Sequence, residues 1–130
     1  MRVHTAADAP SGPLNADYFT GDGRMTRFEG VSEDPTAGVY RVEFAARART
    51  NWHTHSGTQV LYVVEGRCRC QAWGGPVRVA ETGDVVSFAP GEKHWHGADG
   101  DAPMAHLAIN LDLETEWLEP VSDEQYRGDA

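Results

Sequence analysis

Two pairs of histidines, each with one residue between its members, are the feature of this sequence that most directly suggests chemistry. His53 and His55 form the first pair, and His94 and His96 form the second about 40 residues later. Side chains at positions i and i+2 of a β-strand leave the sheet on the same face. Each pair can therefore direct two imidazoles at one point. Because imidazole binds divalent first-row metals, this spacing predicts a metal site.

Gln59 follows the first pair and adds an amide oxygen to the same region. If the two histidine clusters come from adjacent strands of one barrel, four side chains converge on one metal ion: His53, His55, Gln59 and His94. Fewer than six protein ligands leave coordination positions open for water or substrate, as a catalytic site requires. Gln59 has an alternative role, since its amide could instead hydrogen-bond a ligand histidine.

The two remaining histidines of this region are candidates for acid and base chemistry. His96 lies on the same strand face as His94, and His106 faces inward if Ala108 and Asn110 do. An imidazole beside an open metal site can accept and return a proton. A core histidine that only satisfies hydrogen bonds is the alternative for both. We interpret His96 and His106 as the catalytic acid and base.

Candidate pocket walls come from two other predicted strands. Tyr40, Val42 and Phe44 share one strand face and could line a pocket or fill the barrel. Phe44 is interpreted as core. The Tyr40 hydroxyl needs a partner when buried, so Tyr40 is a candidate substrate contact. Val42 and Asn110 complete the predicted pocket.

Two other residue pairs lie close to the candidate ligands in the sequence. Trp52 and Trp95 have the opposite strand parity from the ligand histidines, which predicts that they pack outside the pocket. Cys68 and Cys70 are the only cysteines and share a strand face, where a disulfide between them would be strained. We interpret the cysteines as packed core residues, with soft-metal binding as the alternative.

The elements that must position these side chains are predicted to be short strands. Runs of β-branched and aromatic residues alternate with Gly, Pro, Asp and Asn, which predicts an all-β sandwich or barrel. The residues Ser122 to Gln125 fit a capping box, which predicts a short C-terminal helix. The predicted strands are Met25–Phe28, Val39–Ala45, Gln59–Val64, Arg67–Trp73, Val77–Val79, Val85–Phe88 and Met104–Leu111.

A chain of 130 residues, 40 % of them hydrophobic, is long enough for one core and too short for two ordinary domains. Residues 1–23 contain several Pro and Gly residues and little periodicity, which predicts an extended arm or a partly disordered lead-in. Docking on another subunit is the role we expect for such an arm. Residues 24–121 are predicted to form the barrel, and residues 122–130 the short helix and tail.

The net charge of −9 opposes binding to nucleic acid or to anionic membranes. No apolar run approaches the roughly 20 residues of a membrane helix, and no apolar segment follows a basic start. We therefore expect a cytoplasmic protein that acts on a small molecule.

The spacing of both clusters resembles the two motifs of the cupin superfamily. The first motif corresponds to His53-x-His55-x3-Gln59-x6-Gly66, with Gln in place of the usual Glu and Arg47 in place of the leading Gly. The second corresponds to Gly83-x5-Ala89-x-Gly91-x2-His94, with Ala98 in place of the usual Asn. The resemblance implies a double-stranded β-helix, a jelly-roll barrel whose mouth holds the metal.

A narrower resemblance covers roughly residues 24–127. The segments 51–55, 61–66, 90–98 and 104–109 are similar to carboxymuconolactone-decarboxylase-like cupins and manganese-dependent bacterial (R)-hydroxynitrile lyases, in which Gln at this position is ordinary. The likeness implies one Mn²⁺ ion on the four ligands named above, with His96 and His106 lining the pocket. It also implies a homodimer or homotetramer.

A shell of three imidazoles and one amide brings no negative charge to the metal ion. The ion then keeps its full positive charge, which favours proton and C–C bond chemistry over redox oxygen chemistry. We therefore expect a lyase of hydroxynitrile-lyase type, which cleaves a cyanohydrin reversibly to a carbonyl compound and cyanide. A mononuclear oxygenase and a non-catalytic metal or metabolite-binding module are the alternatives. Fe²⁺, Zn²⁺, Ni²⁺ and Cu²⁺ are alternatives to Mn²⁺.

Overall fold

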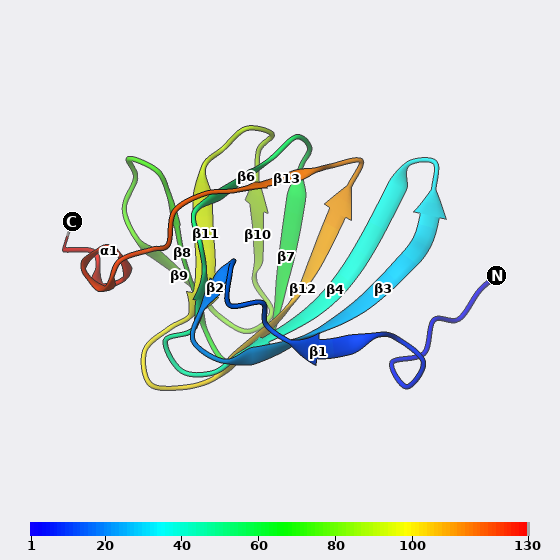
Figure 1. Ribbon diagram of the computed structural model, residues 1–130, viewed down its shortest axis with the longest axis horizontal. Helices are drawn as coiled ribbons and strands as arrows, with labels where there is room; N and C mark the ends of the chain where they lie inside the picture. Colours follow the sequence, from blue (N-terminus) through cyan, green and yellow to red (C-terminus); the bar gives the residue numbers. More distant parts are fainter. Residues whose placement is uncertain (130) are drawn as a thin grey trace.

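Two curved antiparallel sheets face each other in the computed structural model, which describes residues 1–129 (Figure 1). The strands are β1 (Ser11–Pro13), β2 (Phe19–Thr20), β3 (Gly23–Glu33), β4 (Thr36–Phe44), β5 (Arg49–Thr50), β6 (His53–His55), β7 (Gln59–Glu65), β8 (Cys68–Ala72), β9 (Arg78–Ala80), β10 (Val85–Phe88), β11 (His94–Ala98), β12 (Met104–Leu111) and β13 (Thr115–Trp117), and the helix is α1 (Asp123–Arg127). The predicted all-β barrel with a short C-terminal helix is confirmed.

The first sheet has the strand order β1-β3-β4-β12-β7-β10. Its long central strands place the inward-facing side chains in rows. In one row His106 of β12 lies opposite Val42 of β4 and Val63 of β7. In another, Asn110 of β12 lies opposite Gln59 of β7. This register brings four of the predicted site residues onto one inner face.

The second sheet has the order β13-β6-β11-β5-β2, and β8 and β9 extend it on the other side of β11. Strand β11 pairs with β6 so that His94 lies directly opposite His53. The two histidine clusters, far apart in the sequence, therefore meet on adjacent strands. All five residues of β11 are buried.

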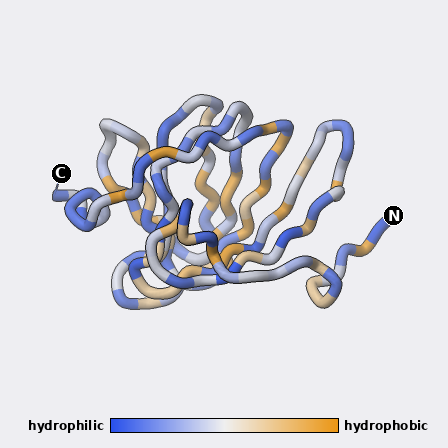
Figure 2. The backbone as a smooth tube through the Cα atoms, in the orientation of Figure 1, coloured by the Kyte–Doolittle hydropathy of each residue, from blue (hydrophilic) through white to orange (hydrophobic). Residues whose placement is uncertain are grey.

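Side chains that alternate between buried and exposed along strands such as β7 build the core. In β7 the side chains of Gln59, Leu61 and Val63 are buried, while Tyr62 between them is exposed. Figure 2 shows hydrophobic residues along the central strands and hydrophilic residues in many of the connections. The fully buried Phe44 packs in the main core with Val42, as expected for Phe44.

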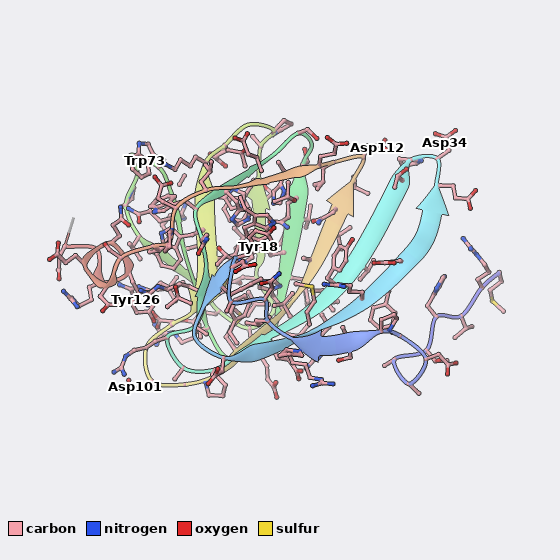
Figure 3. The ribbon with its side chains drawn as sticks, in the orientation of Figure 1. Tyr18, Asp34, Trp73, Asp101, Asp112 and Tyr126 are labelled. Carbon is pink, nitrogen blue, oxygen red and sulfur yellow. The ribbon has the colours of Figure 1, made fainter. Side chains whose placement is uncertain are left out.

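Helix α1 packs on the outer side of the second sheet, where Tyr126 clusters with Trp52, Trp95 and Val121. Ser122 and Gln125 form the predicted capping box, and Gly128 ends the helix with a left-handed backbone at φ 82°. The Tyr126 hydroxyl donates to the Ala98 carbonyl at 2.6 Å, which ties the helix to β11. Tyr126 and Trp73 are labelled in Figure 3 on the side of the barrel that carries the helix.

Trp52 and Trp95 pack with Val121 and Tyr126 in a cluster separate from the main core, so they lie outside the pocket as predicted. Cys68 and Cys70 are free, buried thiols, in agreement with their interpretation as core residues.

The segment predicted as an arm contributes two short strands that the sequence did not indicate. Strand β1 pairs with β3 of the first sheet, and β2 pairs with β5 of the second. The chain before Pro10 stays beside β3, where Arg2 donates to the Val31 carbonyl at 3.2 Å, and the two termini lie at opposite ends of the molecule (Figure 1). Docking of this segment on another copy stays a prediction. No helix of the described residues is long and apolar enough to cross a membrane.

Candidate metal centre and pocket

Three imidazoles from β6 and β11 surround one point inside the barrel. The ring centroids of His53 and His94 lie 4.2 Å apart, those of His53 and His55 4.9 Å apart, and those of His55 and His94 5.2 Å apart. All three side chains are buried. The Phe88 ring stacks on the face of the His94 ring, with 3.7 Å between the centroids, and holds that ring in place.

The Nδ1 atom of each of these histidines has a hydrogen-bond partner. His53 Nδ1 lies 2.8 Å from the Asn51 carbonyl oxygen, and His94 Nδ1 lies 2.7 Å from that of Glu92. A carbonyl oxygen only accepts, so both Nδ1 atoms carry the proton and both Nε2 atoms keep a lone pair. His55 Nδ1 lies 2.8 Å from the Thr115 hydroxyl. Metal-binding histidines are typically oriented in this way through their second nitrogen.

Gln59 brings its amide oxygen to the same point. Its Oε1 lies 3.4 Å from His94 Nε2. Because His94 Nε2 has no proton to donate, these two atoms are both acceptors and repel each other unless a cation lies between them. The Gln59 Nε2 atom is turned away and donates to Asn110 Oδ1 at 2.9 Å.

Unpartnered buried nitrogens also fit a metal ion. His55 Nε2 and His96 Nε2 are buried and have no hydrogen-bond partner among the described residues. Such an atom costs about 1–3 kcal/mol when nothing satisfies it. One nitrogen each of His53, His94 and His96 lies within 4.8 Å of the others, so this compact trio contains His96 in place of the predicted ligand His55. The cluster of neutral nitrogen and oxygen donors therefore suits one divalent cation.

Burial keeps the pocket histidines neutral near pH 7, since a desolvated imidazolium is disfavoured. Desolvation lowers the pKa of His94 to about 4 and that of His106 to about 3. The pKa values of His53 and His96 lie well below the usual value because of burial, and neighbouring imidazoles add to this effect. Burial also lowers the pKa of His55. Neutral imidazole is the form that binds metal.

His96 and His106 form a hydrogen-bonded pair beside the cluster. His96 Nδ1 and His106 Nε2 lie 3.0 Å apart, so one of them donates to the other. Both side chains are buried, and the His106 ring packs 5.3 Å from the Phe44 ring. The His96 ring centroid lies 5.4 Å from that of His53 and 4.8 Å from that of His106, so His96 connects the cluster to His106 of the first sheet.

A cavity of about 280 Å³ opens next to these histidines. The three predicted pocket residues, Tyr40, Val42 and Asn110, line it together with His53, His55, Gln59, His96 and His106. His94 packs behind this lining, against Phe88. The structure thus brings all nine predicted site residues to one region; their roles stay predictions.

Part of the cavity wall was not predicted from the sequence. Tyr18 and Phe19 reach it from around β2, and Thr115 and Trp117 reach it from β13. The Tyr18 ring stacks on Trp117 at 4.7 Å, and Figure 3 labels Tyr18 in front of the barrel interior. The one sequence feature that could have predicted this part of the wall is the i, i+2 spacing of Thr115 and Trp117, which places both on one strand face. The strand that carries them is three residues long, so this spacing is a weak signal.

The cavity lining carries no acidic side chain among the described residues, although the protein has a net charge of −9. Arg27 is the charged residue of the lining, and the neutral remainder consists of imidazoles, amides, hydroxyls and apolar groups. A group that becomes negative inside the cavity therefore meets no carboxylate.

Comparison with known proteins gives three findings. The model of the Cupin domain family matches residues 40–110. The chain is 42 % identical over 130 residues to an (R)-mandelonitrile lyase of Granulicella tundricola, covering 98 % of this chain and 99 % of that protein. A cupin-like protein of Thermotoga maritima has a similar structure, with a TM-score of 0.84 and 36 % identity over 88 % of this chain and 90 % of that one.

A more distant structure shares the fold alone. Oxalate decarboxylase of Bacillus subtilis superposes with a TM-score of 0.65 at 18 % identity, over 82 % of this chain and 30 % of that one. This likeness agrees with the jelly-roll arrangement of the two sheets.

Proposed function

This chain belongs to the cupin family, and on that premise we propose that it is a metal-dependent lyase that cleaves a cyanohydrin reversibly into a carbonyl compound and cyanide. The observation that carries the proposal is the pair of facing acceptors, His94 Nε2 and Gln59 Oε1, 3.4 Å apart in a neutral cluster. The similarity to an (R)-mandelonitrile lyase over almost the whole chain supports the reaction class.

The residues that would hold the metal ion are His53, His55, Gln59 and His94. A divalent ion bound there supplies Lewis acidity, which lowers the pKa of a hydroxyl group next to it. We propose Mn²⁺ because of the resemblance to manganese-dependent lyases; intrinsic affinity alone favours Cu²⁺ over Mn²⁺.

The His96–His106 pair is suited to move the proton of the reaction. When His96 Nδ1 donates to His106 Nε2, His96 Nε2 keeps a lone pair; it is buried without a partner and accepts the proton of the substrate hydroxyl. The electron pair of the broken O–H bond forms the carbonyl, and the electron pair of the broken C–C bond leaves with cyanide. The same histidine pair, joined at 3.0 Å, then returns the proton to cyanide as HCN.

The cavity lining fits an aromatic cyanohydrin such as mandelonitrile. Tyr18, Phe19 and Trp117 form an aromatic wall, with ring centroids of Phe19 and Trp117 5.8 Å apart. Aromatic rings favour offset or edge contacts with one another, so an aryl group is stabilised there. The departing cyanide meets no acidic side chain in the lining.

Cleavage of mandelonitrile tests the proposal. Benzaldehyde release is measured with protein that has been stripped of metal by a chelator, with Mn²⁺-reloaded protein, and with the variant His53→Ala/His55→Ala. The variant His4→Ala, in the exposed N-terminal segment, is the matched control.

We expect release by the reloaded protein and by the control variant, and none above background by the double variant. Equal release by the double variant would refute the proposed site. Stoichiometric Mn²⁺ binding without turnover of any cyanohydrin would instead favour a binding module.

A further inference from the structure

We propose that Asn110 is a positioning residue that holds the Gln59 carboxamide with its oxygen toward the histidine cluster. The inference rests on the proposed metal centre and assigns a role in it to a residue outside the four ligands.

The sheet register places the two residues side by side. Asn110 of β12 is the antiparallel partner of Gln59 of β7, and both side chains point into the barrel. Gln59 Nε2 donates to Asn110 Oδ1 at 2.9 Å. The other end of the same amide, Oε1, then lies 3.4 Å from His94 Nε2. The hydrogen bond to Asn110 thus favours the orientation in which the Gln59 oxygen faces the cluster.

The direction of the amide matters because its two ends differ chemically. The carboxamide oxygen has lone pairs, whereas the nitrogen is a donor with no lone pair available for a metal ion. A flipped Gln59 would present N–H groups to the cluster and could not bind a cation. A glutamate has two equivalent oxygens and needs no such orientation. The need for a partner such as Asn110 therefore arises only with glutamine.

His94 does not provide this orientation. Its Nδ1 donates to the Glu92 carbonyl, so its Nε2 repels the Gln59 oxygen instead of attracting it. In the absence of metal, the contact with His94 favours the flipped amide. A flip of Gln59 alone would place its oxygen against Asn110 Oδ1, so the Gln59 amide can turn over only if the Asn110 amide turns over with it. Asn110 thereby preorganises the shell before the ion binds.

Asn110 also lines the cavity, so a direct substrate contact is the competing role. The two roles differ in what they change. A positioning residue changes the affinity for the metal in the absence of substrate. A substrate contact changes KM and leaves the metal affinity unaltered.

The test measures the dissociation constant for Mn²⁺, without substrate, by competition with a chelating dye. Asn110→Leu removes the acceptor at similar size, and Asn110→Asp retains an acceptor oxygen for Gln59 Nε2. We expect Asn110→Leu to weaken Mn²⁺ binding about 10- to 100-fold, as is typical for loss of a partner that orients a ligand. Asn110→Asp is expected to bind at least as tightly as the unaltered protein.

The same substitution is then repeated in the Gln59→Glu background. Because a carboxylate needs no orientation, Asn110→Leu should change Mn²⁺ affinity there by less than about threefold, which is the coupling that a double-mutant cycle detects. Circular dichroism checks that each variant is folded. If Asn110→Leu is not folded, Asn110→Ala removes the acceptor without added bulk and replaces it.

Two results overturn the inference alone: unchanged Mn²⁺ affinity of the folded Asn110→Leu variant, or the same loss of affinity in the Gln59 and Gln59→Glu backgrounds. If the unaltered protein binds no Mn²⁺, or binds it equally well after His53→Ala/His55→Ala, the proposed metal centre fails and the inference fails with it.

Discussion

Replacing Thr115 with valine should weaken metal binding although Thr115 is not itself one of the proposed ligands. The Thr115 hydroxyl lies 2.8 Å from His55 Nδ1 and fixes the ring so that Nε2 faces the cluster. The corresponding partners of His53 and His94 are main-chain carbonyls, which no substitution removes. Thr115 is therefore the point at which the orientation of a ligand imidazole can be tested by mutation.

The size of the effect follows from the geometry. Loss of a partner that orients a ligand typically weakens metal binding by about 10- to 100-fold. Since only one of the three imidazoles loses its partner here, we expect about tenfold for Thr115→Val, or about 1.4 kcal/mol. Valine has nearly the same shape as threonine and favours strands, so β13 should keep its pairing with β6.

The assay is competition for Mn²⁺ with a chelating dye, alongside thermal unfolding of the metal-free protein. Thr54→Val is the matched control, since Thr54 lies on the neighbouring β6, opposite Glu116 of β13, and alternates with the ligand histidines. We expect Thr54→Val to leave the affinity unaltered. An unchanged dissociation constant for Thr115→Val, or an equal loss in both variants, would refute the reasoning.

Three further predictions concern other parts of the molecule. His106→Phe, which keeps a ring beside Phe44, should lower kcat for cyanohydrin cleavage by about 10²- to 10⁴-fold without changing Mn²⁺ affinity; a changed affinity with an unchanged kcat would contradict the assigned role. Arg49→Met should lower the free energy of unfolding, measured in urea, by about 1.5–3 kcal/mol, because the buried guanidinium donates to the Val121 carbonyl at 2.9 Å and to Asp123 Oδ1 at 2.8 Å; unaltered stability would show that these contacts together contribute nothing. Burial raises the pKa of both thiols, Cys68 and Cys70, so neither should react with a disulfide reagent at pH 8 until the protein is unfolded; rapid labelling of the native protein would contradict the buried positions.

The candidate ligands could be predicted from the sequence because strand periodicity is local. His53 and His55 point the same way whatever the strand pairs with, and so do His94 and His96. Gln59 reaches the same place because the chain returns after a short turn. The spacing of the cupin motif predicted this position. The inward direction of His106 followed from alternation with Ala108.

The orientation of the ligands could not be predicted, because it depends on contacts between distant segments. Thr115 reaches His55 only through the pairing of β13 with β6, and β13 is three residues long. Asn110 was visible as a pocket residue, but its hydrogen bond to Gln59 depends on the register of β12 against β7. Strand registers between distant segments are set by tertiary packing, and local propensity does not determine them.

The aromatic wall was missed for a related reason. Tyr18 and Phe19 lie in a segment rich in turns, with no alternation to mark a strand. Their position is fixed by the two-residue pairing of β2 with β5, which places them against Trp117. A segment without periodicity can still line a pocket when a few long-range hydrogen bonds hold it.

Titration of metal-free protein with Mn²⁺, following cyanohydrin cleavage at each step, tests the central claim most directly. The four proposed ligands form one centre, so activity should rise linearly and reach its plateau at one ion per chain. The His53→Ala/His55→Ala variant should stay inactive throughout the titration. Full activity of the metal-free protein, or a plateau that the double variant also reaches, would contradict the claim that this cluster is the catalytic centre.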